Sequence, residues 1–306
     1  MKFLTLLVAA PLFAQTVERP KILGIAHVAY FVSDLAKARA YYEDFLGFAE
    51  LPFTLKKPDG SERIAFIKIN DNQYVELFAE DPKNDGRLNH IAIYTDNADR
   101  MRDYLASKNI KVPEKVGKGQ TGNKNFTIRD PEGHGVEIVE YQPDSRTSQE
   151  KGKEIPASRI SSHIAHTGVT IGSLSAAMKF YGDILGFKEF WRGGGDPAVL
   201  SWVNMRVPDG DDYVELMLYR DPPSPERRGS ANHICLVVPN VEDAIAKLEA
   251  RPARKSYTRK IEWKVGVNRK RQSNFFDPDG TRAELMEPST IDGKPTPSSA
   301  APPPIL

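Results

Sequence analysis

The sequence predicts an α+β protein built from two copies of one domain. Two observations support this prediction: a repeat that relates the two halves of the chain, and a weaker repeat inside each half, in which an Asn-His or Ala-His strand start precedes an amphipathic helix. Each of the four resulting modules has the order strand, helix and then two or three strands. Such mixed patterns of strands and helices are typical of an α+β fold.

The repeat between the halves relates residues 27–48 to residues 166–187, an offset of 139 (166 − 27). The tetrapeptide Tyr-Val-Glu-Leu at 74–77 recurs at 213–216 with the same offset. Because a repeat of this length and regularity marks a duplicated structural unit, we expect the two halves to share one fold.

The repeat also sets the expected boundaries. We predict a first domain over residues 22–142 and a second over residues 163–288. Residues 143–162 are polar and lack apolar periodicity, which is typical of a linker. Residues 289–306 are rich in Pro, Ser and Ala and are predicted to form a disordered tail.

Local signals define the helix of each module. In the first module an apolar stripe predicts a helix over residues 35–46, with Ser33 or Asp34 as its N-cap and Gly47 in the left-handed stop position. The helices of the other modules are expected to be capped by Asp96, Ser173 and Asn240.

Composition excludes several classes of function. The 306 residues carry 42 Lys and Arg against 41 Asp and Glu, so there is no overall basic field for nucleic acid, and none is expected as a partner. Cys235 is the single cysteine, which excludes an intramolecular disulfide and a cysteine-based zinc cluster. A metal site in this chain would therefore rest on His, Asp and Glu.

The N-terminus predicts export. One lysine precedes a short apolar run that ends in a small residue, so residues 1–14 are expected to be a signal peptide. The run is shorter than the ~20 residues of a membrane span. We therefore expect a periplasmic or secreted protein without a membrane contact beyond the signal peptide, a monomer or a homodimer.

Eight residues recur at corresponding positions of the modules. Four of the six histidines lie in the opening strands, and four glutamates lie mid-strand between apolar neighbours. Each one alone fits a core histidine or a surface glutamate, but a mid-strand carboxylate facing an apolar cavity is costly unless paired or metal-bound. Mixed nitrogen and oxygen ligands suit Zn, Ni, Mn, Fe or Co. The candidate ligands are His27, Glu76, His90, Glu137, His166, Glu215, His233 and Glu284.

These residues, the Leu-Gly-Phe helix ends and the Asp-Pro-Glu/Asp-Gly turns resemble the vicinal oxygen chelate superfamily, which includes glyoxalase I, extradiol dioxygenases and bleomycin resistance proteins. The resemblance implies paired βαβββ modules, each pair forming an eight-stranded cup around one divalent metal. It implies one site of His27, Glu76, His90 and Glu137 and a second of His166, Glu215, His233 and Glu284. Pairing of neighbouring modules is favoured, and pairing of the first with the fourth is the alternative.

The same resemblance implies a reaction. A glyoxalase-like lyase or isomerase acts on a small oxygenated substrate by metal-stabilised enolisation, with Glu137 and Glu284 as the catalytic bases. An extradiol-type dioxygenase and a non-catalytic binding protein of the bleomycin resistance type are the alternatives. The basic segment 251–271 either attracts an anionic small-molecule substrate or forms a solvated face. Lys37 and Ala176 stand where bacterial glyoxalase I has a glutathione-binding arginine, so the substrate stays open.

Overall fold

The computed structural model describes residues 17–79 and 86–305 as two mixed β-sheets with helices. The predicted signal peptide, residues 1–14, lies outside the described residues. Among those that are described, no helix combines the length and apolar character that a membrane span requires.

The elements follow the order that the sequence predicts. Domain 1 and the linker contain β1 (Ile22–Phe31), α1 (Leu35–Arg39), the π-helix η1 (Ala40–Phe45), β2 (Ala49–Glu50), β3 (Leu55–Lys56), β4 (Glu62–Asn70), β5 (Gln73–Phe78), β6 (Leu88–Thr95), α2 (Ala98–Ser107), β7 (Gly117–Lys118), β8 (Lys124–Arg129), β9 (Gly135–Glu140) and α3 (Arg146–Gln149). Domain 2 contains β10 (Ile164–Ile171), α4 (Leu174–Ala177), the π-helix η2 (Met178–Ile184), β11 (Lys188–Gly193), β12 (Trp202–Arg206), β13 (Tyr213–Leu218), α5 (Pro225–Ala231), β14 (His233–Val237), α6 (Val241–Glu249), the 3₁₀-helix η3 (Pro252–Lys255), β15 (Trp263–Val265), β16 (Arg271–Phe276) and β17 (Arg282–Met286).

Neighbouring modules share a sheet, as expected. The first sheet has the order β2-β4-β5-β1-β6-β9-β8-β7, with β3 beside β4, and the second has the order β11-β12-β13-β10-β14-β17-β16-β15. The two modules of each domain meet where their opening strands pair antiparallel, β1 with β6 and β10 with β14. This topology confirms the α+β fold of two tandem domains.

The predicted helix of the first module is α-helical only at its start. Asp34 caps α1 by accepting a hydrogen bond from the Lys37 amide, and Gly47 ends the segment with φ +78°, as predicted. From Ala40 the chain forms the π-helix η1. The wider turn of a π-helix changes which side chains share a face, so Tyr41 and Tyr42 are both buried although they are adjacent.

One predicted cap is displaced by a single residue. Asn97, not Asp96, caps α2, and its side chain accepts from the Arg100 amide. Asp96 instead accepts a hydrogen bond from the Lys21 amide. Asn and Asp are comparable N-caps, so the preceding strand decides which of the two takes the position. Ser173 and Asn240 cap α4 and α6 as expected.

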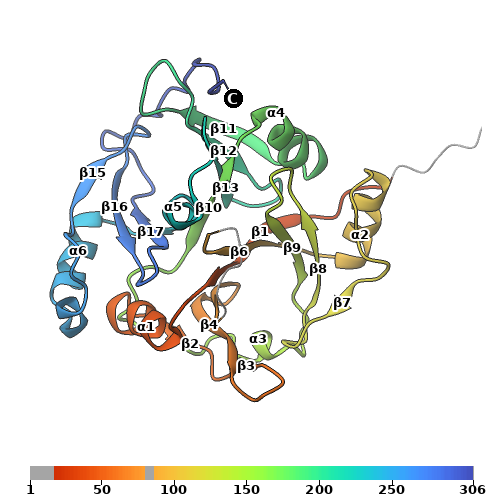
Figure 1. Ribbon diagram of the computed structural model, residues 1–306, viewed down its shortest axis with the longest axis horizontal. Coiled ribbons are helices and arrows are strands. Elements are labelled where there is room, and N and C mark those ends of the chain that lie inside the picture. Colours follow the sequence, from red (N-terminus) through yellow and green to blue (C-terminus); the bar gives the residue numbers. More distant parts are fainter. Residues whose placement is uncertain (1–16, 80–85, 306) are drawn as a thin grey trace, which may run out of the picture.

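The first helix of each domain packs against the other domain. Figure 1 places α1 of domain 1 on the side of α6 and α4 of domain 2 on the side of α2. The contacts agree: the Phe45 ring of η1 stacks on Tyr257 of domain 2 at 4.5 Å, and the Tyr104 hydroxyl of α2 donates to the Ile184 carbonyl. One apolar cluster therefore runs through both domains, which leaves the opposite sheet faces for the candidate sites.

Equivalent residues of the two halves meet at the domain interface. Gln73 and Asp212, which are 139 positions apart, contact each other at 3.2 Å. The Ile25 amide donates to Asp212, and the Ile164 amide donates to Gln73, both at 2.8 Å. Such reciprocal contacts are characteristic of a two-fold interface, here between two domains of one chain.

The Asp-Pro-Glu/Asp-Gly turns also bridge the domains. Glu132 accepts hydrogen bonds from the amides of Gly172 and Ser173 at the start of the domain 2 helix. Asp279 accepts from the amide and the hydroxyl of Ser33 at the equivalent place in domain 1. The turn motif that identified the repeat therefore connects each domain to the first helix of the other.

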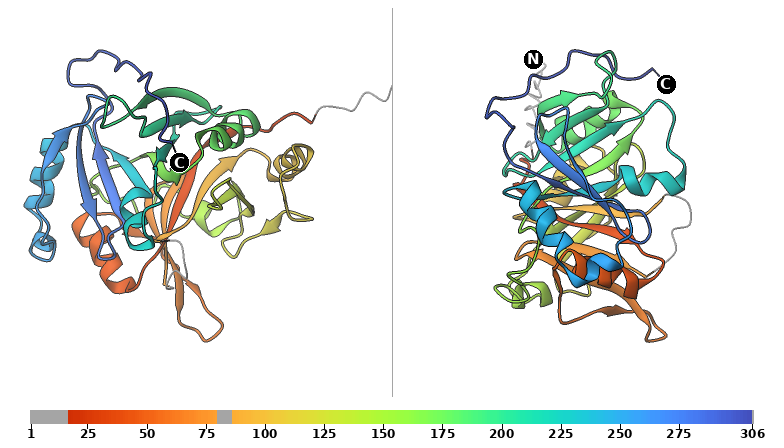
Figure 2. Two further views of the ribbon diagram at one scale, coloured as in Figure 1. Left: turned by 45° about the horizontal axis from the view of Figure 1, so that its top comes forward. Right: turned by 90° about the vertical axis from the view of Figure 1, so that its left-hand side faces the viewer.

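The segments that follow each domain lie against it. In the linker, Arg146 donates its amide to the Thr121 carbonyl and places its guanidinium 3.9 Å from the Phe53 ring. After domain 2, Thr296 donates its hydroxyl to the Asn268 carbonyl, and Leu200 donates its amide to Pro302 (Figure 2, dark blue). The predicted disorder of this tail in solution stays a prediction.

The interface predicts an asymmetric effect of two tyrosine substitutions. The Tyr181 hydroxyl donates to buried Asp130 at 3.0 Å, so Tyr181→Phe is expected to lower the free energy of unfolding by about 1–3 kcal/mol. The buried Tyr41 hydroxyl has no hydrogen-bond partner among the described residues, so Tyr41→Phe, the control, is expected to leave the free energy of unfolding unchanged or to raise it. Urea unfolding measures both values, and equal losses would contradict the assigned hydrogen bond.

Candidate metal centres

Four adjacent strands position the residues of the first site. The register across β5, β1, β6 and β9 forms two rows that face the same side of the sheet. The rows are Glu76, Ala29, His90 and Gly135, and Tyr74, His27, Ala92 and Glu137. Because an alanine separates the two candidate ligands in each row, the imidazoles and carboxyl groups can converge above the centre of the sheet. The predicted set therefore meets in space.

The two imidazoles of site 1 face each other. The Nε2 atoms of His27 and His90 lie 2.9 Å apart. A Glu137 oxygen lies 3.4 Å from His27 Nε2 and 2.9 Å from His90 Nε2. Glu76 lies farther out, with its nearest oxygen 3.6 Å from His27 Nε2. These distances describe a compact triad of His27, His90 and Glu137 with a second carboxyl group beside it.

The two carboxyl groups of site 1 are buried, so a nearby positive charge would stabilise their ionised forms. Burial raises the pKa of the Glu76 carboxyl above its usual value. Burial also opposes ionisation of Glu137, but hydrogen bonds with His27 and His90 outweigh it and hold the pKa of Glu137 far below its usual range. Burial likewise disfavours charged His27, whereas the carboxylates Glu76 and Glu137 raise its pKa. A proton on His27 or a divalent cation can supply the charge that this buried pair of carboxyl groups needs.

The donor set of site 1 fits a metal ion. His90 Nδ1 lies 3.0 Å from the side-chain oxygen of Asn89, so Nδ1 can keep its proton when Nε2 loses the proton shared with Glu137 and binds a metal. The Nε2 atoms of His27 and His90 lie 2.9 Å apart, close enough for both imidazoles to bind one ion. His27, His90 and Glu137 could hold the ion.

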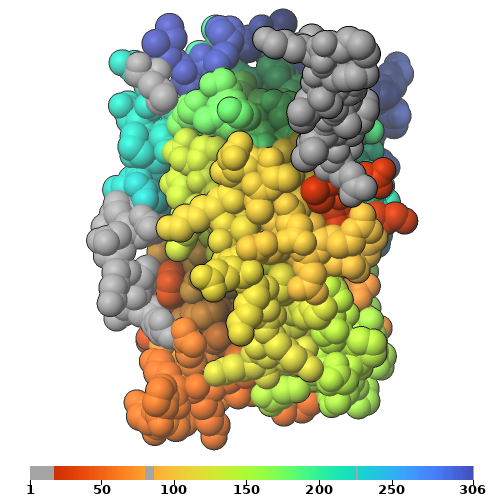
Figure 3. All heavy atoms as spheres, turned by 90° about the vertical axis from the view of Figure 1, so that its right-hand side faces the viewer, coloured from red at the N-terminus to blue at the C-terminus, as the bar shows by residue number. Residues whose placement is uncertain are grey.

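A cavity of about 150 Å³ opens above site 1. One wall is apolar and includes Ile64, Phe66 and Phe78. Gln120 and the linker residue Thr147 belong to the other wall, which is polar and neutral. Figure 3 shows this side of the molecule, where the segment around β7 (yellow) and the linker (yellow-green) lie beside the β3–β4 hairpin (orange). The linker thus contributes to the site, which its polar sequence did not reveal.

Site 2 repeats the arrangement. The Nε2 atoms of His166 and His233 lie 3.1 Å apart, and a Glu284 oxygen lies 3.4 Å from each of them. A Glu215 oxygen lies 3.6 Å from His233 Nε2. The cavity above measures about 200 Å³, and Trp191 is among the residues that line it. All eight predicted ligands therefore converge in two groups of four.

Two residues that the sequence analysis did not select change site 2. Cys235 occupies the row position of Ala92 and forms a possible ligand group with His166 and Glu284. Arg282 precedes Glu284 by two residues, as Gly135 precedes Glu137, so a guanidinium stands where domain 1 has no side chain. A direct comparison of the two repeats would have found both differences.

Arg282 competes with a metal for His233. Its Nη2 lies 2.7 Å from His233 Nδ1, and the same Nδ1 lies 2.7 Å from the Ala231 carbonyl. Only one of these contacts can be a hydrogen bond, because Nδ1 must carry a proton to donate to Ala231 and a lone pair to accept from Arg282. In the second case Nε2 carries the proton and cannot bind a metal.

One glycine and several charges surround the His233 imidazole of site 2. His233 leans over Gly168, where an added Cβ would lie 2.2 Å from the imidazole. Burial and the Arg282 charge lower the pKa of His233 to about 3, so this imidazole is neutral at physiological pH. Burial opposes ionisation of Glu284, but hydrogen bonds with His166 and His233 hold the pKa of Glu284 well below its usual value. Site 2 keeps the donor set of site 1 and adds a fixed positive charge.

The basic segment 251–271 serves several purposes. Arg251 donates to the carbonyls of Phe45 and Ser158 between the domains, and Arg254 pairs with Glu249. Lys264 lines the site 2 cavity. The segment is therefore neither a uniform solvated face nor a single anion-binding loop.

The comparisons with known proteins agree with this geometry. Glyoxalase I of Saccharomyces cerevisiae is 22% identical over 247 residues, which are 74% of this chain and 69% of the relative. The Mn(II)-bound glyoxalase from Novosphingobium aromaticivorans superposes with a TM-score of 0.64 at 19% identity, over 94% of this chain and 88% of that one. The 2,3-dioxygenase LapB from Pseudomonas sp. KL28 superposes with a TM-score of 0.65 at 14% identity, over 91% of this chain and 97% of that one.

At these identities the structural likenesses establish the fold alone. The family match is independent of them and covers residues 24–138 and 163–285, which lie within the two domains predicted from the repeat. Both halves therefore belong to the Glyoxalase/Bleomycin resistance protein/Dioxygenase superfamily, and with them the chain itself is a tandem member of that family.

Proposed function

We propose that this protein is a metal-dependent, glyoxalase-like lyase or isomerase that acts on a small carbonyl or hydroxy substrate. The observation that carries the proposal is the convergence of His27, His90 and Glu137 with a second carboxyl group, Glu76, at the floor of a cavity with an apolar wall. Domain 2 repeats this convergence. A binding protein without chemistry has no need of two carboxyl groups buried at such cost.

Two features favour isomerase chemistry over ring cleavage. Each site offers two carboxyl groups, so one can move a proton while the other stays with the imidazoles. The similarity to yeast glyoxalase I extends through both domains, since it covers 74% of the chain. Both features support the proposal without identifying the substrate.

A divalent cation held by His27, His90 and Glu76, with Glu137 displaced by the substrate, would polarise the substrate carbonyl and so acidify the adjacent C–H. In this proposal Glu137 accepts that proton and returns it to the neighbouring carbon, so no net proton is gained or lost. Phe66 and Phe78 exclude water from the reacting carbon. In domain 2, Glu284 has the role of the base, and Arg282 and Lys264 bind an anionic group of the substrate.

The two sites are expected to differ in metal affinity. Because the Arg282 charge lies beside site 2, Mn²⁺ should bind there more weakly than at site 1, and Arg282→Met should tighten binding at site 2 by about 10-fold or more. Isothermal titration of chelator-treated protein measures both affinities. Arg192→Gln, which removes a domain 2 arginine bound to Glu189, is the control and should change neither. Equal affinities in the wild type would contradict the role of Arg282.

Catalysis is expected to depend on Glu137. Hemithioacetals of methylglyoxal with glutathione, which is anionic, or with 2-mercaptoethanol, which is neutral, serve as substrates in D₂O, and NMR measures turnover and deuterium incorporation. Glu137→Gln should lower kcat for the neutral substrate by about 100-fold or more, and Glu284→Gln should affect mainly the anionic one. Metal analysis of each variant separates loss of the base from loss of the ion.

Separate assays test the alternatives. Oxygen consumption with a catechol and ferrous iron, without isomerisation of any carbonyl compound, would favour an extradiol-type dioxygenase. Saturable binding of small molecules without turnover would favour a binding protein of the bleomycin resistance type. Export remains part of the proposal, and N-terminal sequencing of protein from the periplasm or the medium should begin at Gln15.

A further inference from the structure

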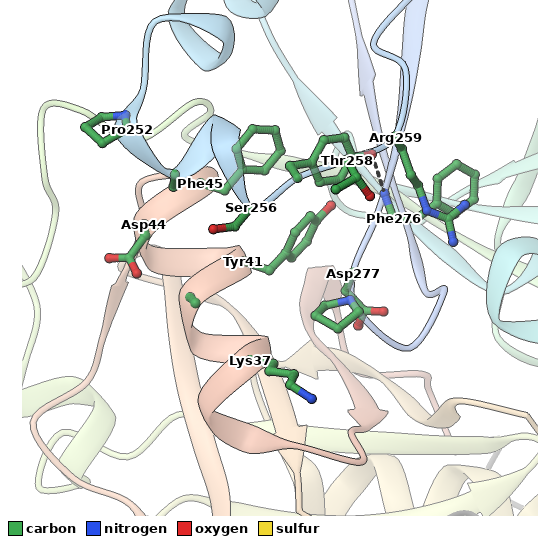
Figure 4. Close-up of a pocket in the computed structure, with 14 residues that line it drawn as sticks. Lys37, Tyr41, Asp44, Phe45, Pro252, Ser256, Thr258, Arg259, Phe276 and Asp277 are labelled. Carbon is green, nitrogen blue, oxygen red and sulfur yellow. Dashed lines mark hydrogen bonds between the residues drawn. The ribbon is translucent and has the colours of Figure 1, made fainter.

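A pocket of about 880 Å³ lies outside both metal sites, at the contact between the domains. Helix η1 of domain 1 forms one side, and residues 252–259 with residues 276–278 of domain 2 form the other. None of the residues that line this pocket lines either of the two cavities above the metal sites. Figure 4 shows its residues, which converge from both domains.

Aromatic side chains form the walls. Phe45 stacks on Tyr257 at 4.5 Å between ring centres and 12° between ring planes, and Tyr41 lies 6.3 Å from Tyr257. The Tyr257 hydroxyl accepts a hydrogen bond from the Phe276 amide, which holds the Tyr257 ring in place. The pocket is therefore preformed and suited to a flat ligand.

Two buried polar groups line this pocket. Asp277 is 2% exposed and Tyr41 is 5% exposed. Among the described residues, neither the second carboxyl oxygen of Asp277 nor the hydroxyl of Tyr41 has a hydrogen-bond partner within 3.5 Å. Each unpaired buried group costs about 1–3 kcal/mol. The Tyr41 hydroxyl points from η1 toward the Thr258 segment in Figure 4.

At the equivalent place in the other half, the buried carboxyl group has hydrogen-bond partners. Asp130, the counterpart of Asp277, accepts hydrogen bonds from the Tyr181 hydroxyl and from His134. Phe180 stands where the first half has Tyr41, so no hydroxyl is left there without a partner. The missing partners are therefore specific to the Asp277 end of the interface.

The ends of the pocket carry opposite charges. Arg259 is exposed, lies 4.6 Å from the Phe276 ring, and forms no ion pair with a described residue. Asp44 lies at the opposite end in Figure 4. An anionic group would therefore be attracted toward Arg259 and away from Asp44.

We propose that this interdomain pocket is a second small-molecule site, which binds a flat aromatic acid with a hydroxyl group. The aromatic ring packs against Tyr41 and Tyr257 where they line the pocket, the hydroxyl group points toward Asp277 and the Tyr41 hydroxyl, and the carboxylate faces Arg259. Such a ligand would contact both domains and place a hydroxyl group beside the two polar groups that are unpaired in the described part of the chain.

The state of Asp277 suits this ligand. Burial raises the pKa of Asp277 to about 7, so both carboxyl forms are present near neutral pH. A phenol hydroxyl can donate to the ionised form and accept from the protonated form. Binding is therefore compatible with either form of the carboxyl group.

Calorimetric titration with 4-hydroxybenzoate tests the proposal. Ala40→Trp fills the rim of the pocket and should weaken binding by about 10-fold or more. Arg259→Gln and Tyr41→Phe should each weaken it by about 3- to 10-fold. Lys179→Trp introduces the same bulk at the equivalent exposed position of the other half, and this control should leave binding unchanged. Benzoate, which lacks the hydroxyl group, should bind more weakly.

Titrations with and without a chelator distinguish this pocket from the metal sites. Equal affinity under both conditions is expected, because no residue of the pocket belongs to the metal centres. Loss of binding on chelation, an affinity that Ala40→Trp leaves unchanged, or no saturable binding up to about 10 mM would overturn the proposal.

Discussion

The antiparallel pairing of the two opening strands in each domain is the constraint on which the rest of the structure depends. In domain 1 this pairing places His27 opposite Ala92 and His90 opposite Ala29, so the two imidazoles lie diagonally rather than side by side. The parallel strands on either side then bring Glu76 and Glu137 to the same face. A shift of one residue would turn the histidines into the apolar cluster behind the sheet. The four candidate ligands can therefore meet only in this strand register.

The two halves of the chain share this geometry and differ at other positions. Equivalent residues still meet at the interface, where Gln73 contacts Asp212. Away from it the halves differ: Arg282 adds a charge beside the imidazoles of domain 2, and Tyr41 and Asp277 leave an interdomain pocket with unpaired polar groups. Since the first helix of domain 1 packs against domain 2, both halves of the chain form this pocket. The chain therefore combines two similar candidate centres with different electrostatics and a shared interface.

Much of the fold was predictable because it rests on local signals and on the repeat. Alternation placed Glu76 on the strand face of Tyr74 and Phe78, and all three line one cavity. The π-helix was not predictable, because an apolar stripe does not distinguish it from an α-helix over two turns. The contact of Arg282 with His233 was not predicted, because it depends on packing between neighbouring strands and not on spacing along the chain. The interdomain pocket likewise depends on how the domains pack.

The position of the bound ion tests the central claim most directly. Crystals grown with Mn²⁺ and measured at the manganese absorption edge should show an anomalous peak between the Nε2 atoms of His27 and His90 and the Glu137 carboxylate. A weaker peak is expected at His166 and His233, beside Arg282. Anomalous density at other residues, or none at either pair of histidines in crystals that contain Mn²⁺, would contradict the assignment of these clusters as metal centres.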